Sequence, residues 1–140
     1  MARDAYLEHL AKVRLFSSCS DRDLQKIAKA SDEVSIDAGR VLVEQGTTGR
    51  ECYVILEGSA SVERNGVKVT TLGPGDPFGE LALLDGGPRT ATVTAETPMR
   101  VLVLGQREFA GVLDEVPGLA HKVMASLARR IRELDQMTFG

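Results

Sequence analysis

The sequence predicts a mainly β domain, an antiparallel β-roll of the jelly-roll type with helices at both ends. Short runs rich in valine and threonine, separated by glycine breaks, fill residues 32–104. Helical periodicity is confined to residues 4–30 before them and 106–137 after them. Because no helical pattern separates the short runs, they favour antiparallel neighbours over a doubly wound parallel sheet.

Composition limits the classes of function to consider. The chain of 140 residues suits a single domain, residues 1–140, with enough apolar content to bury a core. Its net charge of −3 provides no field that attracts nucleic acid or an anionic membrane. No stretch approaches the roughly 18 apolar residues of a membrane span, so we expect no membrane insertion by this chain. Cys19 and Cys52 lack metal-ligand spacing and fit a reducing cytoplasm better than a disulfide scaffold.

Residues 4–30 predict two helices ahead of the strands. In residues 4–14, apolar side chains recur at helical spacing, namely Tyr6, Leu7, Leu10 and Val13. The next segment, SDRDLQKIAKA, begins with Ser20 as a predicted N-cap and has Asp23 three residues later. The inner face of this second helix is predicted to consist of Leu24, Ile27 and Ala28.

Residues 32–104 predict the β-roll itself. The strand pattern is found in RVLVEQ, ECYVILEG, SASVERNGVKVTTL, TATVTA and MRVLVLG. Within the third run, Asn65-Gly66 predicts a two-residue hairpin, because both positions of such a turn need a positive φ.

Residues 106–137 predict a C-terminal helix pair. QREFAGVLDEV forms the short first helix, and Pro117 then stands where a helix start tolerates proline. The long second helix carries an apolar stripe of Val123, Met124, Leu127, Ile131 and Leu134. Packing of this stripe on the domain's own core is the preferred interpretation. The 3-4-3 spacing also fits the seam of a homodimer, which stays an alternative.

Residues 78–93, FGELALLDGGPRTATV, gather one acid, one arginine and three glycines. Gly79 lets a ligand approach the backbone closely, and residues 81–84 can form a helical turn whose first N–H groups point out beside Glu80. The D-G-G-P sequence supplies a tight return. Arg89 then begins a strand, from which its planar fork of donors can reach the same anion.

These residue types predict binding rather than catalysis. Arg89 and backbone N–H groups would hold one phosphate, while Glu80, which only accepts hydrogen bonds, would take hydroxyl donors. A sugar phosphate with a free hydroxyl near its phosphate matches that pair. The alternative is an ordinary surface ion pair between Glu80 and Arg89, worth at most about 1 kcal/mol. The glycines and turns around the pair favour binding.

The same segment closely resembles the phosphate-binding cassette of cyclic nucleotide-binding domains, which regulate cyclic-nucleotide-dependent kinases, channels and bacterial catabolite-activator-type regulators. VRLFSSCSDRDLQKIA resembles the N-terminal helical segment of that family, and GTTGRECYVILEGSASV resembles its central strands. The C-terminal helix pair is also typical, so the resemblance extends over residues 15–134. It implies a β-roll that acts as a sensor and is not an enzyme.

The resemblance also implies roles for individual residues. Glu80 would accept from the ribose 2′-hydroxyl and Arg89 would pair with the cyclic phosphate, while backbone N–H groups and the Thr90 hydroxyl complete the cage. The implied ligand-binding residues are Phe78, Gly79, Glu80, Leu81, Ala82, Arg89, Thr90 and Ala91. Arg50 and Pro77 depart from the family pattern. These two departures affect the expected shape of the loops rather than the phosphate chemistry.

The implied ligand is a cyclic nucleotide monophosphate, cAMP or cGMP, with no separate cofactor. Thr90 follows the cassette arginine, as in many cGMP-selective members, whereas bacterial-type domains of this style often respond to cAMP. We expect cAMP, with cGMP as the competitor. In the family a residue of the last helix caps the base when that helix closes, and the candidates are Arg129, Arg130, Arg132 and Glu133. Phe109 is expected to pack at the hinge between the sheet and the last helices, against Leu81 or Leu84.

The sequence also allows three other interpretations. A cupin-type enzyme needs clustered histidines on strands, but His9 and His121 lie in the two terminal helical regions. A transcription regulator would have a sensor half of this kind, but residues 1–140 contain no helix-turn-helix or basic recognition segment after the long last helix, so we do not expect this chain to read DNA by itself. We therefore expect a stand-alone sensor with an unknown protein partner, or the sensor part of a protein with a fused effector domain. A structural β-roll that binds nothing is the remaining alternative.

Overall fold

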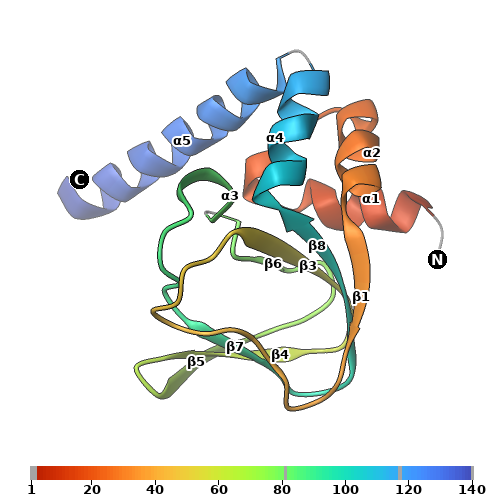
Figure 1. The fold of residues 1–140 in the computed structure, drawn as a ribbon. Coiled ribbons are helices and arrows are strands. Elements are labelled where there is room, and N and C mark those ends of the chain that lie inside the picture. The colour runs from red at the N-terminus through yellow and green to blue at the C-terminus, as the bar shows by residue number, and fades with distance from the viewer. Residues whose placement is uncertain (1–2, 81, 117, 140) are drawn as a thin grey trace.

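Helices lie at one end of two curved sheets in the computed structural model, which describes residues 3–80, 82–116 and 118–139 (Figure 1). The helices before the strands are α1 (Arg3–Ala11) and α2 (Asp21–Ala30), with the short 3-10 helix η1 (Arg14–Phe16) between them. The helices after the strands are α4 (Gln106–Glu115) and α5 (Leu119–Phe139), and α5 extends sideways from the body. No described helix combines the length and the apolar character needed to cross a membrane.

The strands of the described residues form two four-stranded antiparallel sheets. The first has the order β1 (Asp32–Ile36), β8 (Met99–Gly105), β3 (Glu51–Glu57) and β6 (Pro77–Phe78). The second has the order β2 (Val41–Val43), β7 (Thr92–Ala95), β4 (Ala60–Arg64) and β5 (Val67–Leu72). The short helix α3 (Ala82–Asp85) lies in the chain between β6 and β7. This architecture confirms the predicted antiparallel β-roll with flanking helices.

The sheet that contains β3 and β8 is covered on both faces. In β8, Val101 belongs to the core inside the roll, whereas Leu102 and Leu104 belong to the core formed with the helices. Cys52 and Val54 of β3 also face the helices. Successive side chains of a strand point to opposite faces, so two buried faces require an almost continuous apolar run. The runs CYVIL and VLVL meet that requirement.

Two local predictions are confirmed at the level of hydrogen bonds and dihedral angles. The Asp23 N–H donates to the Ser20 hydroxyl over 3.2 Å, and the Ser20 N–H donates to the Asp23 carboxylate over 3.2 Å. This is a complete capping box at the start of α2. The β4–β5 turn has φ values of 54° at Asn65 and 81° at Gly66, both positive as a tight hairpin requires.

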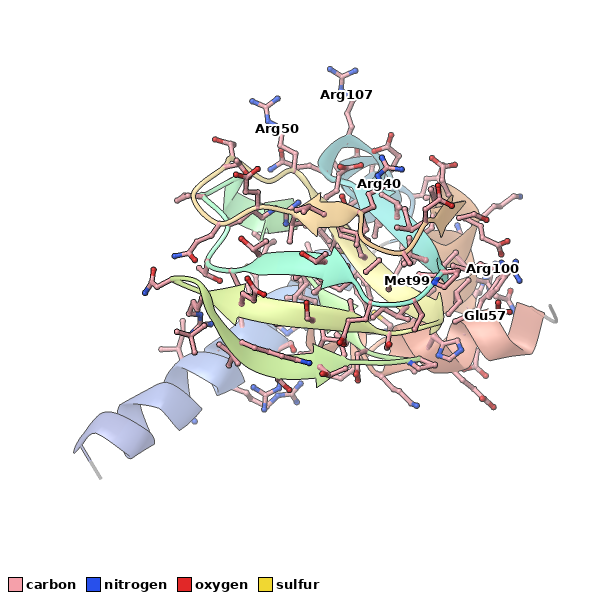
Figure 2. The ribbon with its side chains drawn as sticks, turned by 90° about the horizontal axis from the view of Figure 1, so that it is seen from below. Arg40, Arg50, Glu57, Met99, Arg100 and Arg107 are labelled. Carbon is pink, nitrogen blue, oxygen red and sulfur yellow. The ribbon has the colours of Figure 1, made fainter. Side chains whose placement is uncertain are left out.

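A charged cluster joins α1 to the edge of the first sheet. Arg100 of β8 forms an ion pair with Glu57 over 3.2 Å and another with Glu33 of β1, and the first pair lies side by side in Figure 2. The Tyr6 hydroxyl donates to the same Glu33 carboxylate. Because these groups face solvent, we assign the cluster a role in orientation rather than a large share of stability.

The prediction that the α5 stripe packs as a whole on the core is wrong. Val123 is buried and Leu127 is half-buried against the helical core, but Met124 is 61% exposed and Ile131 is 60% exposed. The Leu134 side chain lies outside the described residues. The buried face of α5 is centred instead on Leu119, Val123 and Ser126, so that Met124 and Ile131 lie beyond its edge.

A matched pair of valine variants tests where the core lies. Val101→Ala removes methyl groups that are fully buried inside the roll, and we expect it to lower the free energy of unfolding by about 1.5–3 kcal/mol. Val67→Ala alters a side chain that is 67% exposed, so a change within about 0.5 kcal/mol is expected. Urea denaturation measures both values, and equal losses would contradict this assignment of the core.

Candidate functional site

A cavity of about 560 Å³ opens where β6 ends and β7 begins, against β2, β4 and β5. This volume is in the range of about 300–1,000 Å³ that is typical of small-molecule sites. Leu81 and the Ala82 side chain lie outside the described residues. The other predicted ligand-binding residues all line the cavity, namely Phe78, Gly79, Glu80, Arg89, Thr90 and Ala91.

The backbone of Arg89 is held by the loop between β2 and β3. The Arg89 N–H donates to the Thr47 carbonyl over 2.7 Å, and the Gly46 N–H donates to the Arg89 carbonyl over 2.9 Å. Thr48 and Pro88 form an antiparallel bridge beside them. The N–H and the carbonyl of Arg89 are both hydrogen-bonded to one loop. These bonds fix the position of the Arg89 backbone just before β7.

Two glycines leave room for the Arg89 side chain. A Cβ added at Gly49 would lie 2.2 Å from Nε of Arg89, and one at Gly79 would lie 2.5 Å from Nη1. Real Cβ atoms essentially never approach other atoms so closely, so any larger residue would force the guanidinium to move. Gly79 also has a φ of 79°, which L residues with side chains rarely adopt. Nη1 of Arg89 lies 3.5 Å from the Gly79 carbonyl.

Glu80 is half-buried, and its Oε2 atom is buried within the site. The Glu80 carbonyl accepts from the Leu83 N–H over 3.2 Å, at the start of the turn that contains α3. The pKa of the Cys52 thiol is raised to about 12, chiefly by burial and next by the Glu80 carboxylate, while the Arg89 guanidinium acts in the opposite direction. The charges of Glu80 and Arg89 thus both influence the Cys52 thiol of β3, and both residues line the cavity.

A glycine-lined arginine beside an acceptor-only carboxylate is the arrangement that the family resemblance implies. The sequence model of the family described as "Cyclic nucleotide-binding domain" matches residues 33–116. The chain belongs to this family. The matched range contains the eight strands of the described residues except Asp32 at the start of β1, together with α3, the whole of α4 and the cavity, so membership includes the site itself.

Similar proteins come from several kinds of regulator. A cAMP-dependent protein kinase regulatory subunit of Aspergillus niger is 36% identical over 122 residues, which are 86% of this chain and 30% of that protein. The N-terminal domain of a Streptomyces coelicolor A3(2) transcriptional regulator has a TM-score of 0.87 and 31% identity, covering 93% of this chain and 94% of that one. The cAMP-bound PfPKA-R (141-441) has a TM-score of 0.68 and 26% identity, covering 94% and 47%. This chain spans less than a third of the curated relatives.

The structure adds residues to the site of this cyclic nucleotide-binding domain that sequence reasoning missed, namely Gly49 beside the Arg89 side chain and one wall of the cavity. Gly49 was overlooked because nothing in the sequence shows that it approaches Arg89. The wall opposite the cassette consists of Val62, Arg64, Thr70 and Leu72 on β4 and β5. The Asn65-Gly66 hairpin was a usable signal, because strand alternation places residues 60, 62 and 64 on one face.

Phe109 packs among the helices of the domain, as expected, and among the described cassette leucines Leu83 rather than Leu84 belongs to the same core. Its ring lies 5.8 Å from that of Phe16, centroid to centroid. Leu83 is buried in the same core, whereas Leu84 is 39% exposed. Leu84 is therefore the wrong residue for this packing, and Leu81 lies outside the described residues.

The last helix of the domain is docked on the N-terminal segment. The Lys122 ammonium lies 2.9 Å from the Asp23 carboxylate, whose pKa is lowered chiefly by this hydrogen bond. The Ser126 hydroxyl donates to the Arg14 carbonyl over 2.6 Å, and Nη2 of Arg129 donates to the Ser18 hydroxyl over 3.1 Å. We call these three contacts the α5 clamp.

The two base-capping candidates whose side chains the structure describes, Arg129 and Arg132, do not line the cavity in this arrangement. Among the described residues, none from α5 lines the cavity. Arg129 contributes to the α5 clamp and Arg132 is exposed. The side chains of Arg130 and Glu133 lie outside the described residues. Capping by one of the four stays a prediction.

Thiol reactivity tests the burial of β3 behind the site. Burial raises the pKa of Cys52 to about 12 and that of half-buried Cys19 to about 11, so both thiols are protonated at pH 8. The Cys19→Ser variant retains only the Cys52 thiol. We expect no reaction of the native variant with an aromatic disulfide reagent, and reaction of one thiol per chain after denaturation. Rapid reaction of the native variant would contradict the burial of Cys52.

Proposed function

We propose that this domain binds a cyclic nucleotide in the 560 Å³ cavity and acts as a non-catalytic regulatory sensor, with cAMP favoured and cGMP as the competitor. The observation that carries the proposal is the convergence of Arg89 and Glu80 on one cavity, with two glycines where a Cβ would collide with the guanidinium. A surface ion pair needs no such glycines. They leave the guanidinium close to the backbone, where a ligand phosphate can reach both.

Each polar group has a role that follows from its chemistry. Arg89 pairs with the single negative charge of the cyclic phosphate through its planar donors. Glu80 accepts from the ribose 2′-hydroxyl, and the backbone N–H groups near Gly79 and Ala91 and the Thr90 hydroxyl complete the phosphate cage. Each charge-assisted hydrogen bond is worth about 1.5–3 kcal/mol. Arg89 is therefore the leading contribution to affinity.

The preference for cAMP is supported by the names of relatives. The similar kinase regulatory subunits are named as cAMP-dependent, and one similar solved structure is cAMP-bound. Thr90 lines the cavity and is exposed to it, and its hydroxyl can also meet the 2-amino group of guanine. cGMP is therefore the competitor to test.

The output is a change in the position of α5. The α5 clamp holds this helix against the N-terminal segment and away from the cavity. Closure over the base breaks the clamp and brings Arg129, Arg130, Arg132 or Glu133 to the ligand, so that binding shifts a two-state equilibrium. An effector protein or fused domain in the cytoplasm detects the shift. The exposed Met124 and Ile131 on α5 fit a homodimer seam.

Arginine variants test the binding site. Arg89→Ala is expected to weaken cAMP binding at least about tenfold, because one charge-assisted contact is lost. Gly49→Ala is expected to weaken it too, by displacing the same guanidinium. Arg107→Ala serves as the control, because Arg107 points away from the body on α4 (Figure 2). Calorimetric titration of the four proteins measures the affinities. Unchanged affinity in Arg89→Ala would overturn the proposal.

A clamp variant tests the output. Lys122→Met breaks the ion pair with Asp23 but leaves the capping box of α2 in place. This contact is worth about 1 kcal/mol and is present only while the α5 clamp holds the helix away from the cavity. Its loss therefore favours the closed arrangement and should raise cAMP affinity about fivefold. Ligand should also change hydrogen exchange within residues 117–137. If the variant shows no tighter affinity and ligand causes no change in exchange, this route of output is excluded while the binding proposal stands.

A further inference from the structure

Two hydroxyl groups take part in the α5 clamp, and solvent reaches that of Ser18. Ser18 is exposed and lies in the turn between η1 and α2, whereas Ser126 of α5 is only 3% exposed. The Ser18 hydroxyl accepts a hydrogen bond from Nη2 of Arg129 over 3.1 Å. An enzyme that modifies hydroxyl groups can therefore reach Ser18 while the α5 clamp is intact.

The charge of Arg129 is not neutralised by the clamp. A guanidinium carries five N–H donors in a planar fork, and the hydroxyl of Ser18 is a neutral acceptor. In the part of the chain that the structure describes, no carboxylate forms an ion pair with Arg129. A phosphoryl group on Ser18 would present three acceptor oxygens and a charge of about −1.5 to −2 at pH 7 to this guanidinium.

The surroundings of Ser18 also favour a negative charge. Ser18 precedes the N-cap residue Ser20 of α2 by two positions, and the helix dipole stabilises anions near a helix N-terminus. The pKa of the neighbouring Cys19 thiol is raised to about 11 by burial and next by Asp23, while the Lys122 ammonium lowers it. The charge of Lys122 therefore reaches the same turn. Its pairing with Asp23 over 2.9 Å limits the repulsion between that carboxylate and a phosphate.

We propose that Ser18 is a phosphorylation site and that its phosphoryl group locks the α5 clamp. This rests on the proposed function, in which nucleotide binding breaks the clamp. A protein kinase transfers the γ-phosphoryl group of a nucleoside triphosphate, so that the bond from Ser18 Oγ to phosphorus forms. The bond from phosphorus to the β-phosphate oxygen breaks, the nucleoside diphosphate leaves, and the hydroxyl proton passes to a base of the kinase. The phosphate then accepts charge-assisted hydrogen bonds from Arg129, which must break before α5 covers the cavity.

The test compares the unmodified chain with the whole chain phosphorylated at Ser18 alone, prepared by genetic encoding of phosphoserine. We expect calorimetry to show cAMP binding weakened about tenfold, because nucleotide must now break a charge-assisted contact. Hydrogen exchange of residues 119–129 without nucleotide should be slower than in the unmodified chain. Phosphorylation at Ser17 is the matched control, because Ser17 is also exposed but its hydroxyl donates to the Arg14 carbonyl over 2.9 Å. It should leave both measurements near their unmodified values.

Arg129→Gln separates a specific contact from a general effect of charge. Within this variant, we expect the cAMP affinities with and without phosphate on Ser18 to differ by less than about twofold. A full effect in Arg129→Gln, or an equal effect of phosphorylation at Ser17, would overturn the lock. Unchanged affinity and exchange after phosphorylation at Ser18 would also overturn it, with the proposed function intact. An unmodified chain that binds no cyclic nucleotide would overturn the proposed function, and the exchange measurement would still decide whether the phosphate holds α5.

Discussion

The functional site depends on the close approach of one guanidinium to two glycines. Arg89 occupies space that a Cβ at Gly49 or Gly79 would fill. Its backbone is held by both of its hydrogen bonds to the β2–β3 loop. An arginine side chain loses considerable freedom when it is confined in this way. Confinement beside glycine backbone makes physical sense when an anion completes the coordination, because the donors are then oriented before the ligand arrives.

The rest of the fold connects this site to the helices. β3 and β8 are buried on both faces, so one sheet contributes to the core inside the roll and to the core under α4. Leu83 of the cassette lies in the helical core with Phe109. A displacement of the cassette therefore changes packing at α4, the helix that precedes α5. The α5 clamp gives the last helix a defined position in this structure, and its release is part of the proposed output.

Local patterns in the sequence were sufficient for the architecture and for the cassette side of the cavity. Ser20 with Asp23, and Asn65 with Gly66, act through their nearest neighbours, and the structure shows both as predicted. Gly49 and the β4–β5 wall were missed, because their importance arises from contacts between segments distant in the chain. The α5 stripe was misjudged for a related reason. Helical spacing identifies a face, but the partner that covers it is decided by tertiary packing, which leaves Met124 and Ile131 exposed.

The central claim is that the Arg89 guanidinium is the phosphate ligand of a cyclic nucleotide. The most direct measurement is an NMR titration of the Arg89 Nε–H resonance with cAMP, assigned by comparison with Arg89→Lys. The account predicts that this resonance shifts on addition of ligand and becomes protected from solvent exchange, while the resonance of exposed Arg107 stays in place. A domain that binds cAMP with an unchanged Arg89 resonance would contradict it.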